Sequence, residues 1–351
     1  MQDLKDYIKA EAARLGFCLC GFTGAEPLAD YDRYLHWLES EPLGTMTYLK
    51  RPDTLAKRAD PHLLLPDVQS ICVLAVPMGL KPEKNGPEVA SYAHYMDYHD
   101  AILPMAETLV QSIQSYMTDF TSKKNKTIIF HNFPIKDDVA DHQLPPAHKP
   151  QPPISQPSAP DLSYRICIDS APILERSLAV RAGLGWVGKS SMFISPMHGS
   201  ALFLCEVLLS LSIEPDEPYT RDGCGSCTRC VNACPNQCID PESRTIRADH
   251  CAAYLTIEHK GDFTPEQSKM VGTHLFGCDA CLRACPWNKK NTGRSPLPLA
   301  KAIPNMEDYA LSDEEFKNKF KNTPVLRTKA KGLRRNIEAV HKNIQSSGHQ
   351  T

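Results

Sequence analysis

The sequence has neither a long apolar run nor a strong charge of one sign. No stretch approaches the roughly 18 apolar residues that a membrane-spanning helix needs, and residues 1–16 lack the apolar core of a signal peptide. The formal net charge is -2 over 351 residues, so no global field attracts the protein to nucleic acid or to a lipid surface. We therefore expect a cytoplasmic protein with no membrane partner, in which any contact with nucleic acid uses a local basic patch.

The sequence also lacks a complete nucleotide-binding pattern. Residues 183–190 read GLGWVGKS and satisfy both G-x-G-x-x-G and G-x-x-x-x-G-K-S. Both motifs need a strand before the glycines and a helix after them, so that phosphate meets free N–H groups at a helix N-terminus. Here the glycines follow a predicted helix and precede a strand-like segment, which argues against a nucleotide site. They favour close approach of the backbone to another large cofactor at Gly188, with Lys189 and Ser190 as donors.

Cysteine is abundant, and most of the 14 cysteines lie between residues 224 and 285. The run that begins at Cys224 and ends at Cys234-Pro235 reproduces the ferredoxin pattern C-x2-C-x2-C-x3-C-P. In that pattern the first three thiolates bind one 4Fe-4S cluster and the fourth binds another. One motif therefore predicts two clusters. The remaining five cysteines, in apolar surroundings, are interpreted as buried bystander thiols.

A second cysteine run supplies most of the remaining ligands. Cys278, Cys281 and Cys285-Pro286 keep the same phase, but Leu275 stands where the first cysteine should be. Cys251 or Cys238 must complete this set, and spacing alone does not exclude either. We assign one cluster to Cys224, Cys227, Cys230 and Cys285, and the other to Cys234, Cys251, Cys278 and Cys281. Two zinc tetrads are the alternative, but a third cysteine in the first run and two Cys-Pro pairs favour iron-sulfur.

Hydrophobic periodicity indicates an α/β arrangement upstream of the cysteines. It predicts helices over 2–16, 30–39, 101–117 and from Pro172 to about 183, and strands at 17–22, 70–76 and 164–168. Residues 121–162 are rich in Pro, Lys, His and Gln and are predicted to be an exposed, largely disordered insertion, with 127–130 compatible with a short strand.

Several motifs together resemble the epoxyqueuosine reductase family. The resemblance is carried by IDSAPILERSLAVRAGLGWVGKSSM, HGSALFLCEVLL, YLTIEHKG and LFGCDACLRACPWN, with RADPHLLLP and DYHD upstream and TPVLRTKAKGLRRN downstream. It covers nearly the whole chain apart from 121–162 and the last residues. The insertion is a departure from the family, and the chain is too short for the C-terminal helical-repeat domain that some members carry.

The resemblance implies a cytoplasmic enzyme that uses cobalamin and two 4Fe-4S clusters. Family members reduce the epoxide of epoxyqueuosine at the tRNA wobble position, which gives queuosine in the last step of that pathway. The implied fold is an α/β cobalamin-binding domain (1–215), a ferredoxin-like double 4Fe-4S domain (216–295) and a short basic helical C-terminal extension (296–351). No D-x-H-x-x-G motif for a His-ligated corrinoid occurs. A reductive dehalogenase-like reductase of a small molecule and a plain electron carrier are the alternatives.

The resemblance also implies roles for single residues. Asp169 matches the general acid of the family, and burial against the corrin is expected to raise its pKa. The other interpretation of Asp169 is an ordinary helix N-cap before Pro172. The expected cobalamin contacts are Arg58, Arg176, Gly188, Lys189 and Ser190. Asp97, Tyr98 and His99 are expected on the substrate side of the pocket. For Arg58 and Arg176, the other interpretation is ordinary surface charge.

The resemblance implies that the partner is tRNA containing epoxyqueuosine. The sequence does not identify the electron donor. Residues 316–336 concentrate eight basic side chains in a chain that is otherwise nearly neutral. Such a patch can contact phosphates with salt-dependent affinity, and a solvated helical face is the other interpretation. The patch comprises Lys317, Lys319, Lys321, Arg327, Lys329, Lys331, Arg334 and Arg335.

Overall fold

The N-terminal part of the chain is built on one four-stranded sheet. The structure, a computed structural model, describes residues 2–82, 86–128, 162–290 and 295–348. The strand order is β1-β2-β7-β4, and every neighbouring pair is antiparallel. The strands are β1 (Leu19–Thr23), β2 (Ser70–Pro77), β7 (Leu202–Leu209) and β4 (Tyr164–Cys167). The predicted strands are therefore confirmed, and they meet in an antiparallel sheet.

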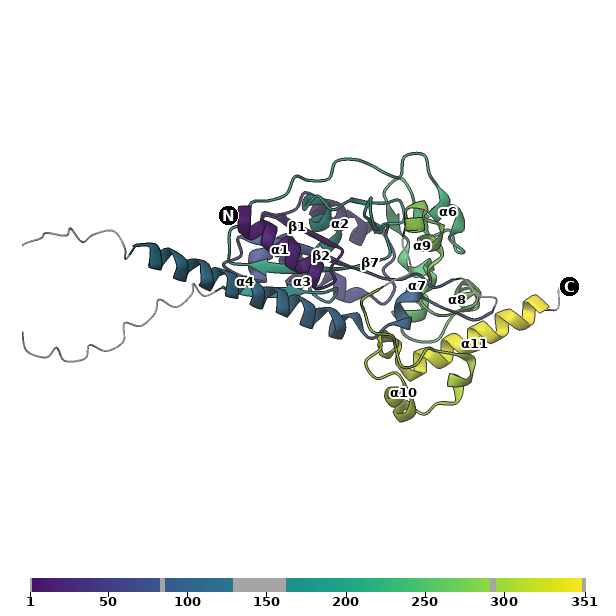
Figure 1. The fold of residues 1–351 in the computed structure, drawn as a ribbon. Coiled ribbons are helices and arrows are strands. Elements are labelled where there is room, and N and C mark those ends of the chain that lie inside the picture. The colour runs from purple at the N-terminus through teal and green to yellow at the C-terminus, as the bar shows by residue number, and fades with distance from the viewer. Residues whose placement is uncertain (1, 83–85, 129–161, 291–294, 349–351) are drawn as a thin grey trace, which may run out of the picture.

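Alternation of side chains along β2 and β7 divides the apolar residues between two faces of the sheet. One face packs against α1 (Gln2–Arg14) and α4 (Tyr98–Ile128), and the Tyr7 and Tyr116 rings of these two helices stack 4.5 Å apart. The other face packs against α5 (Glu175–Arg181) through Leu178 and Ala179. Figure 1 shows α1 and α4 side by side along the sheet.

Two helix boundaries differ from the sequence-based prediction. Helix α4 begins at Tyr98 and continues to Ile128, because no glycine or proline interrupts residues 105–133. Thr127 and Ile128 are therefore helical, so the predicted strand at 127–130 is wrong at these two positions; the rest of the insertion, 129–161, lies outside the described residues. Helix α5 begins at Glu175 and not near Pro172, and it ends before Gly183, whose φ is +78°.

The cysteine-rich region consists of short elements. Its helices are α6 (Arg229–Ala233), α7 (Ala252–Ile257), α8 (Pro265–Val271) and α9 (Ala280–Ala284). Its strands are β8 (Ile239–Asp240), β9 (Thr245–Ile246) and β10 (His274–Phe276). Strand β10 pairs in parallel with β3 (Glu88–Val89), which belongs to the N-terminal half of the chain. The remaining elements of the N-terminal half are α2 (Asp30–Ser40), α3 (Pro52–Ala59), β5 (Trp186–Val187) and β6 (Phe193–Ile194).

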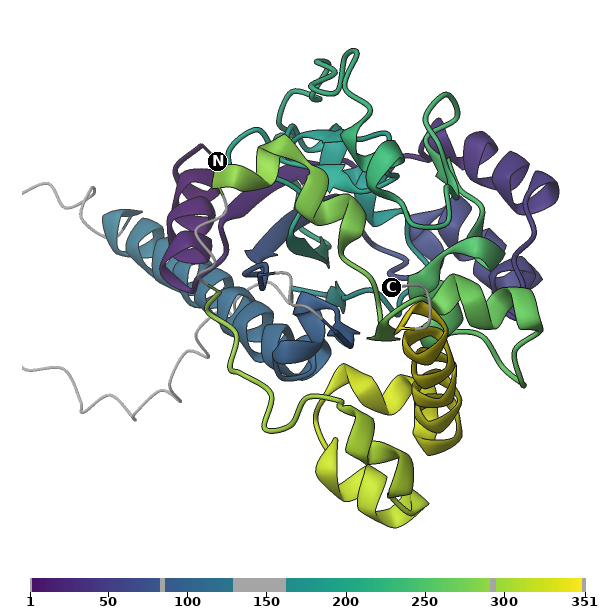
Figure 2. The same ribbon diagram turned by 90° about the vertical axis from the view of Figure 1, so that its right-hand side faces the viewer.

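The C-terminal residues complete the core of this region. They are therefore part of the folded body and not the extension that was predicted for 296–351. Helix α11 (Lys329–Gly348) buries Leu333, Ile337 and Val340 against residues of α7, α8 and β10. Helix α10 (Asp313–Lys319) adds Phe316 to the same core. Figures 1 and 2 both show α11 lying against the cysteine-rich part of the chain. In the described part of the chain, no helix combines the length and apolarity needed to cross a bilayer.

Candidate active site

A cavity of about 420 Å³ lies between the sheet domain and the cysteine-rich region. Residues from α2, α3 and the start of α5 form one side of its lining, and residues from β9 and α7 form the other. Asp169 and Cys251 both line it, although they are 82 positions apart in the sequence. The predicted general acid and a predicted cluster ligand therefore line the same cavity.

Asp169 is held in a constrained conformation at the edge of the cavity. It follows β4 and has a φ of +51°, which is uncommon for a residue other than glycine. The Tyr98 hydroxyl donates to Asp169 Oδ2 over 2.6 Å, and the Asp169 N–H donates to Glu175 Oε1 over 2.7 Å. The N-cap of α5 is Leu174, so the interpretation of Asp169 as a helix cap is wrong. The Asp169 side chain is oriented by Tyr98 and exposed to the cavity.

The segment around Tyr98 lies next to Asp169, as expected for the substrate side. His99 Nδ1 lies 2.9 Å from Asp97 Oδ1, and this hydrogen bond raises the pKa of His99 and lowers that of Asp97. The His99 ring stacks on the Tyr98 ring at 4.3 Å between centroids. His99 Nε2 is buried and has no hydrogen-bond partner in the described part of the chain. The placement fits the prediction, and the substrate contact itself stays a prediction.

Glu175 and Arg176 begin helix α5 and face the cavity. Desolvation by the surrounding protein raises the pKa of the half-buried Glu175 to about 7, and the Asp169 carboxylate adds to this shift. Desolvation also lowers the pKa of Arg176, whose Nη1 donates to the Ser191 carbonyl over 2.7 Å. The sequence did not single out Glu175, because nothing in its neighbourhood distinguishes it from an ordinary acidic residue in a first helical turn.

Arg58 supports the fit of a large polar cofactor in this cavity. Its guanidinium lies 5.2 Å from the Tyr34 ring centroid, and its buried Nη1 has no hydrogen-bond partner among the described residues. A buried N–H group without an acceptor is costly, so a ligand oxygen at this position would complete it. The amide and phosphate oxygens at the periphery of cobalamin have this chemistry, and Arg176 lines the same cavity.

Gly188, Lys189 and Ser190, at the end of the glycine loop, do not line the cavity. Lys189 Nζ donates to the Gly225 carbonyl over 2.7 Å, and Ser190 is buried. A Cβ at Gly188 would come within 2.4 Å of the Ile194 side chain and 3.4 Å of Cys224 Sγ. Only the flanking Val187 and Ser191 line the cavity. The loop follows helix α5, contains the two-residue strand β5 and precedes β6, so the predicted helix–loop–strand order is confirmed.

The cysteines predicted to bind the first cluster lie close together. Burial raises the pKa of Cys230, and the nearby Cys224 and Cys285 sulfurs raise it further. The Cys227 N–H donates to the Cys224 carbonyl over 2.9 Å. Cys224 and Cys227 also line a surface hollow of about 650 Å³. This half of the predicted ligand set therefore reaches the molecular surface.

The cysteines predicted for the second cluster form another group. Burial raises the pKa of Cys278 to about 12, and Cys251 adds to this shift. Burial also raises the pKa of Cys281, with further contributions from Cys278 and Cys251. In the residues that the structure describes, no three Cys, His, Asp or Glu side chains converge as they would around a single metal ion. The ligands of a 4Fe-4S cluster bind separate iron atoms and need not converge on one point.

Cys238 is a ninth thiol beside the second group. Its Sγ lies 3.4 Å from Cys234 Sγ, and its thiol also interacts with Cys251. Cys251 directly precedes α7 and lies near both Cys278 and Cys281. Cys251 thus lies near both other predicted ligands, whereas Cys238 contacts Cys234 and Cys251. The assignment of Cys251 as the ligand stays a prediction.

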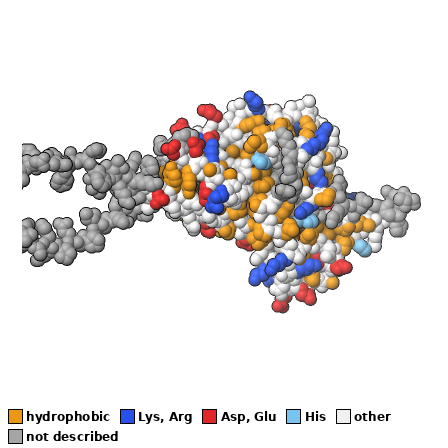
Figure 3. Space-filling model, viewed as in Figure 1, with side chains coloured by type: hydrophobic (Ala, Val, Ile, Leu, Met, Phe, Trp, Pro, Cys, Tyr) orange, Lys and Arg blue, Asp and Glu red, His pale blue; other side chains and the backbone are white. Residues whose placement is uncertain are grey.

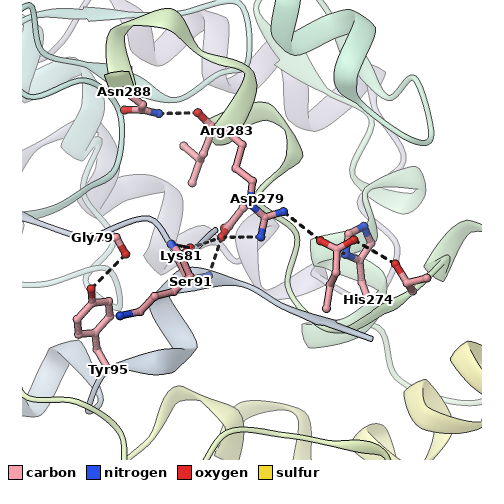
Figure 4. A network of polar contacts seen from close by, with 11 residues as sticks. Gly79, Lys81, Ser91, Tyr95, His274, Asp279, Arg283 and Asn288 are labelled. Atoms are coloured by element: carbon pink, nitrogen blue, oxygen red, sulfur yellow. Dashed lines mark hydrogen bonds and ion pairs between the residues drawn. The ribbon is translucent and has the colours of Figure 1, made fainter. Parts of the chain in front are cut away.

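A polar network joins the cluster region to the N-terminal half (Figure 4). Asp279, between two predicted ligands, accepts hydrogen bonds from the Ser91 N–H and hydroxyl at 2.6 and 2.5 Å. Arg283 Nη1 donates to Glu88 Oε2 over 3.0 Å. These contacts fix α9, which carries Cys281, against the segment that leads to Tyr98.

Trp186, in the N-terminal half of the chain, makes a second contact with the cysteine-rich region, directly with a predicted cluster ligand. Its indole Nε1–H points at Cys224 Sγ over 3.5 Å, and its ring packs edge-on against Trp287 at 5.0 Å between centroids. Trp287 donates to the Gly223 carbonyl over 3.1 Å. An aromatic pair therefore surrounds the loop that begins the first cysteine run.

Comparison with known proteins gives a consistent result. Residues 223–288 match the family model described as "4Fe-4S double cluster binding domain", and residues 58–126 match the model described as "Epoxyqueuosine reductase QueG, DUF1730". The chain is 31% identical to an epoxyqueuosine reductase of Cellulophaga algicola over 343 residues, which cover 95% of this chain and 96% of the relative. The chain belongs to the epoxyqueuosine reductase family. The predicted family is thus confirmed, and the cluster-domain match favours iron-sulfur over zinc.

Other members of the epoxyqueuosine reductase family show the same similarity. The Escherichia coli epoxyqueuosine reductase is 30% identical over 334 residues, which cover 90% of this chain and 75% of that protein. A structure of the family determined with an epoxyqueuosine-modified tRNA-Tyr stem loop has a TM-score of 0.71, 26% identity, and coverage of 99% and 83% of the two chains. A Bacillus subtilis structure, with TM-score 0.70, 25% identity and the same coverage, is described as having its catalytic aspartate loop swung out of the active site.

In this member of the family, much of the predicted basic patch is engaged internally. Arg327 pairs with Glu258 at 2.8 Å, and Lys319 pairs with Asp308. Arg335 donates to the carbonyls of Leu255, His259 and Gly261. Figure 3 shows acidic side chains among the basic ones on this lobe. In the described part of the chain, the exposed patch residues without an ion pair are Lys317, Lys321 and Lys329.

Proposed function

We propose that this protein reduces the epoxide of epoxyqueuosine in tRNA to give queuosine. The observation that carries this proposal is that Asp169 and Cys251 line one cavity, because the proposed proton donor and the proposed cluster would then both reach a substrate bound there. The family member crystallised with an epoxyqueuosine-modified stem loop supports tRNA as the substrate. The full-length similarity to epoxyqueuosine reductases supports the same reaction.

The reaction needs electrons and protons at one place. Two C–O bonds of the epoxide break, a C=C bond forms between the two carbons, and the oxygen leaves as water after receiving two electrons and two protons. Cobalamin, when bound, supplies the low-potential cobalt that passes electrons to the substrate. Arg58 and Arg176 would hold its polar periphery. Asp169, oriented by Tyr98, would deliver protons to the oxygen as the general acid.

The positions of the cysteines suggest the order of electron transfer. The group containing Cys224 and Cys227 lines a surface hollow, whereas Cys251 lines the cavity. Electrons would enter at the first cluster and leave from the second. We retain the boundaries 1–215 for the cobalamin and substrate domain, 216–295 for the cluster domain and 296–351 for the C-terminal part. The physiological donor is not assigned.

An anaerobic assay tests the proposed function. Protein with reconstituted clusters is mixed with a chemical reductant and tRNA carrying epoxyqueuosine, with and without cobalamin, and the nucleosides are analysed by mass spectrometry. We expect loss of one oxygen from the modified base only when cobalamin is present. An unchanged base, in protein with intact clusters and bound cobalamin, would contradict the proposal.

A further inference from the structure

Cys238 is a buried thiol that belongs to neither of the two predicted ligand sets. Its exposed fraction is 6%, and its Sγ lies 3.4 Å from Cys234 Sγ. Its thiol also interacts with that of Cys251. Cys234 and Cys251 are both assigned to the second cluster, so Cys238 contacts two predicted ligands of the same cluster.

The backbone fixes the Cys238 side chain in this place. Cys238 directly precedes β8, and its carbonyl accepts the Arg247 N–H over 2.9 Å where the β8–β9 hairpin begins. In the turn before it, the Gln237 N–H donates to the Cys234 carbonyl over 3.2 Å. The Asn236 side chain ties the same turn to the His250 carbonyl over 2.8 Å. The contact between the sulfurs is therefore set by a turn and a hairpin that are both hydrogen-bonded.

Only one arrangement of charge suits this contact when the cluster is bound. A cysteine that binds iron does so as a thiolate, so Cys234 then carries no proton. Backbone N–H groups of residues 236–238 point at the Cys234 sulfur, and such donors suit an anion. Two anionic sulfurs in direct contact would repel each other, so Cys238 keeps the proton that a free thiol holds at neutral pH. The Cys238 S–H is therefore the donor, and Cys234 Sγ is the acceptor.

A hydrogen bond to a ligand sulfur changes the redox properties of a cluster. It stabilises the reduced form more than the oxidised form, because the reduced form carries more negative charge, and it thereby raises the reduction potential. We propose that Cys238 donates a hydrogen bond to Cys234 Sγ and raises the reduction potential of the second cluster. This inference rests on the predicted ligand sets and not on the identity of the substrate.

The place of the second cluster gives this hydrogen bond a use. The predicted ligand Cys251 lines the cavity, whereas Cys224 and Cys227 of the first cluster line a surface hollow. A higher potential at the second cluster favours transfer of an electron to it from the first. Cys238 thus acts through a cluster ligand to hold electrons on the side of the cavity.

A redox titration of the holoenzyme tests the inference. The protein with both clusters is titrated anaerobically with a chemical reductant, and the reduced clusters are followed by electron paramagnetic resonance. Cys251→Ala, which is expected to keep the first cluster, identifies the signal of that cluster. In Cys238→Ala we expect the ratio of reduced to oxidised second cluster, at a fixed potential, to fall about threefold or more. A ratio equal to that of the wild type would overturn the inference.

Two matched variants separate the hydrogen bond from a disturbance of packing. Cys238→Ser retains a donor, so the second cluster should keep a potential close to the wild-type value. Cys167→Ala removes another buried thiol, 1% exposed, from the apolar layer between the sheet and α5, and should also leave the potential unchanged. If Cys238→Ser lowered the potential as much as Cys238→Ala, the hydrogen bond would be refuted.

Iron content distinguishes a donor from a ligand. Cys238→Ala and Cys238→Ser should both retain the iron of two clusters, because neither removes a predicted ligand. Loss of about half of the iron from both variants would show that Cys238 itself binds the second cluster, and the inference would fall.

An infrared measurement on the wild-type holoenzyme does not need a variant that folds. The S–H stretch of Cys238 should shift when the second cluster is reduced, and it should therefore appear in the difference spectrum between reduced and oxidised protein. A difference spectrum without an S–H band would refute the donor. An enzyme that leaves epoxyqueuosine unchanged would contradict the proposed function, whereas the titration and the infrared band would still report on Cys238.

Discussion

Arg335 is expected to stabilise the cluster region and not to bind tRNA. Its guanidinium donates to the carbonyls of Leu255, His259 and Gly261 over 2.8–3.0 Å and lies 4.1 Å from the centroid of the Phe263 ring. Arg335→Ala would leave three carbonyls at the end of α7 without this donor. Each lost hydrogen bond contributes about 1 kcal/mol, and packing is lost as well. We therefore expect the free energy of unfolding to fall by about 2–4 kcal/mol.

The loss of stability in Arg335→Ala should also weaken binding of the second cluster. Helix α7 begins immediately after Cys251, so loosening its C-terminal end also loosens a predicted ligand. We expect the melting temperature of Arg335→Ala to fall by roughly 3–5 °C, with iron released from the second cluster first. Calorimetry and iron content measured during heating would record both effects.

Arg334→Ala is the matched control, because it removes the same charge one residue away. Arg334 pairs at 2.9 Å with Asp313, whose side chain is 76% exposed, so its ion pair contributes about 0–1 kcal/mol. The reasoning would be refuted if the two variants were equally stable. It would also be refuted if Arg335→Ala bound tRNA more weakly than Arg334→Ala at a temperature where both are folded.

Three further predictions follow from the site. Cys251→Ala should lose about half of the iron, whereas Cys238→Ala should retain both clusters; equal iron loss in the two variants would contradict the assignment of Cys251. Trp186→Phe removes an N–H donor to Cys224 Sγ and should lower the reduction potential of one cluster, as measured by a redox titration followed by electron paramagnetic resonance. His99 has a raised pKa because of Asp97, so its contribution to stability is complete below pH ~6.5 and is lost as the pH rises through the raised folded value. In Asp97→Asn the NMR titration of His99 should move to lower pH, and an unmoved curve would exclude this cause.

The sequence predicted the features that depend on local pattern. Strand positions such as 70–76 and 164–168 follow from apolar runs bounded by turns, and the two cysteine groups follow from spacing that one ferredoxin-like segment requires. The family resemblance identified Asp169, which does lie in the cavity. These features need only neighbouring residues or a recognised motif.

The sequence could not predict features that depend on how distant segments meet. The hydrogen bond from the Lys189 amine to the Gly225 carbonyl joins residues 36 positions apart, and the cofactor contact of Lys189 stays a prediction. Arg335 was predicted to belong to the basic patch, because its carbonyl partners lie 74 to 80 positions away in the sequence. Glu206 did leave a signal, since it is a single acidic residue inside the apolar run FLCEVLL. Only the fold shows that its carboxyl group is buried and has no hydrogen-bond partner among the residues that the structure describes.

The most direct test compares wild-type protein with Asp169→Asn at equal iron and cobalamin content. The quantity measured is the rate at which epoxyqueuosine in tRNA loses its oxygen, followed by nucleoside mass spectrometry under anaerobic conditions. We expect Asp169→Asn to bind tRNA normally and to react at least about 100-fold more slowly, because a neutral amide cannot donate the proton. A rate equal to that of the wild type would remove Asp169 from the reaction and contradict the account of this site.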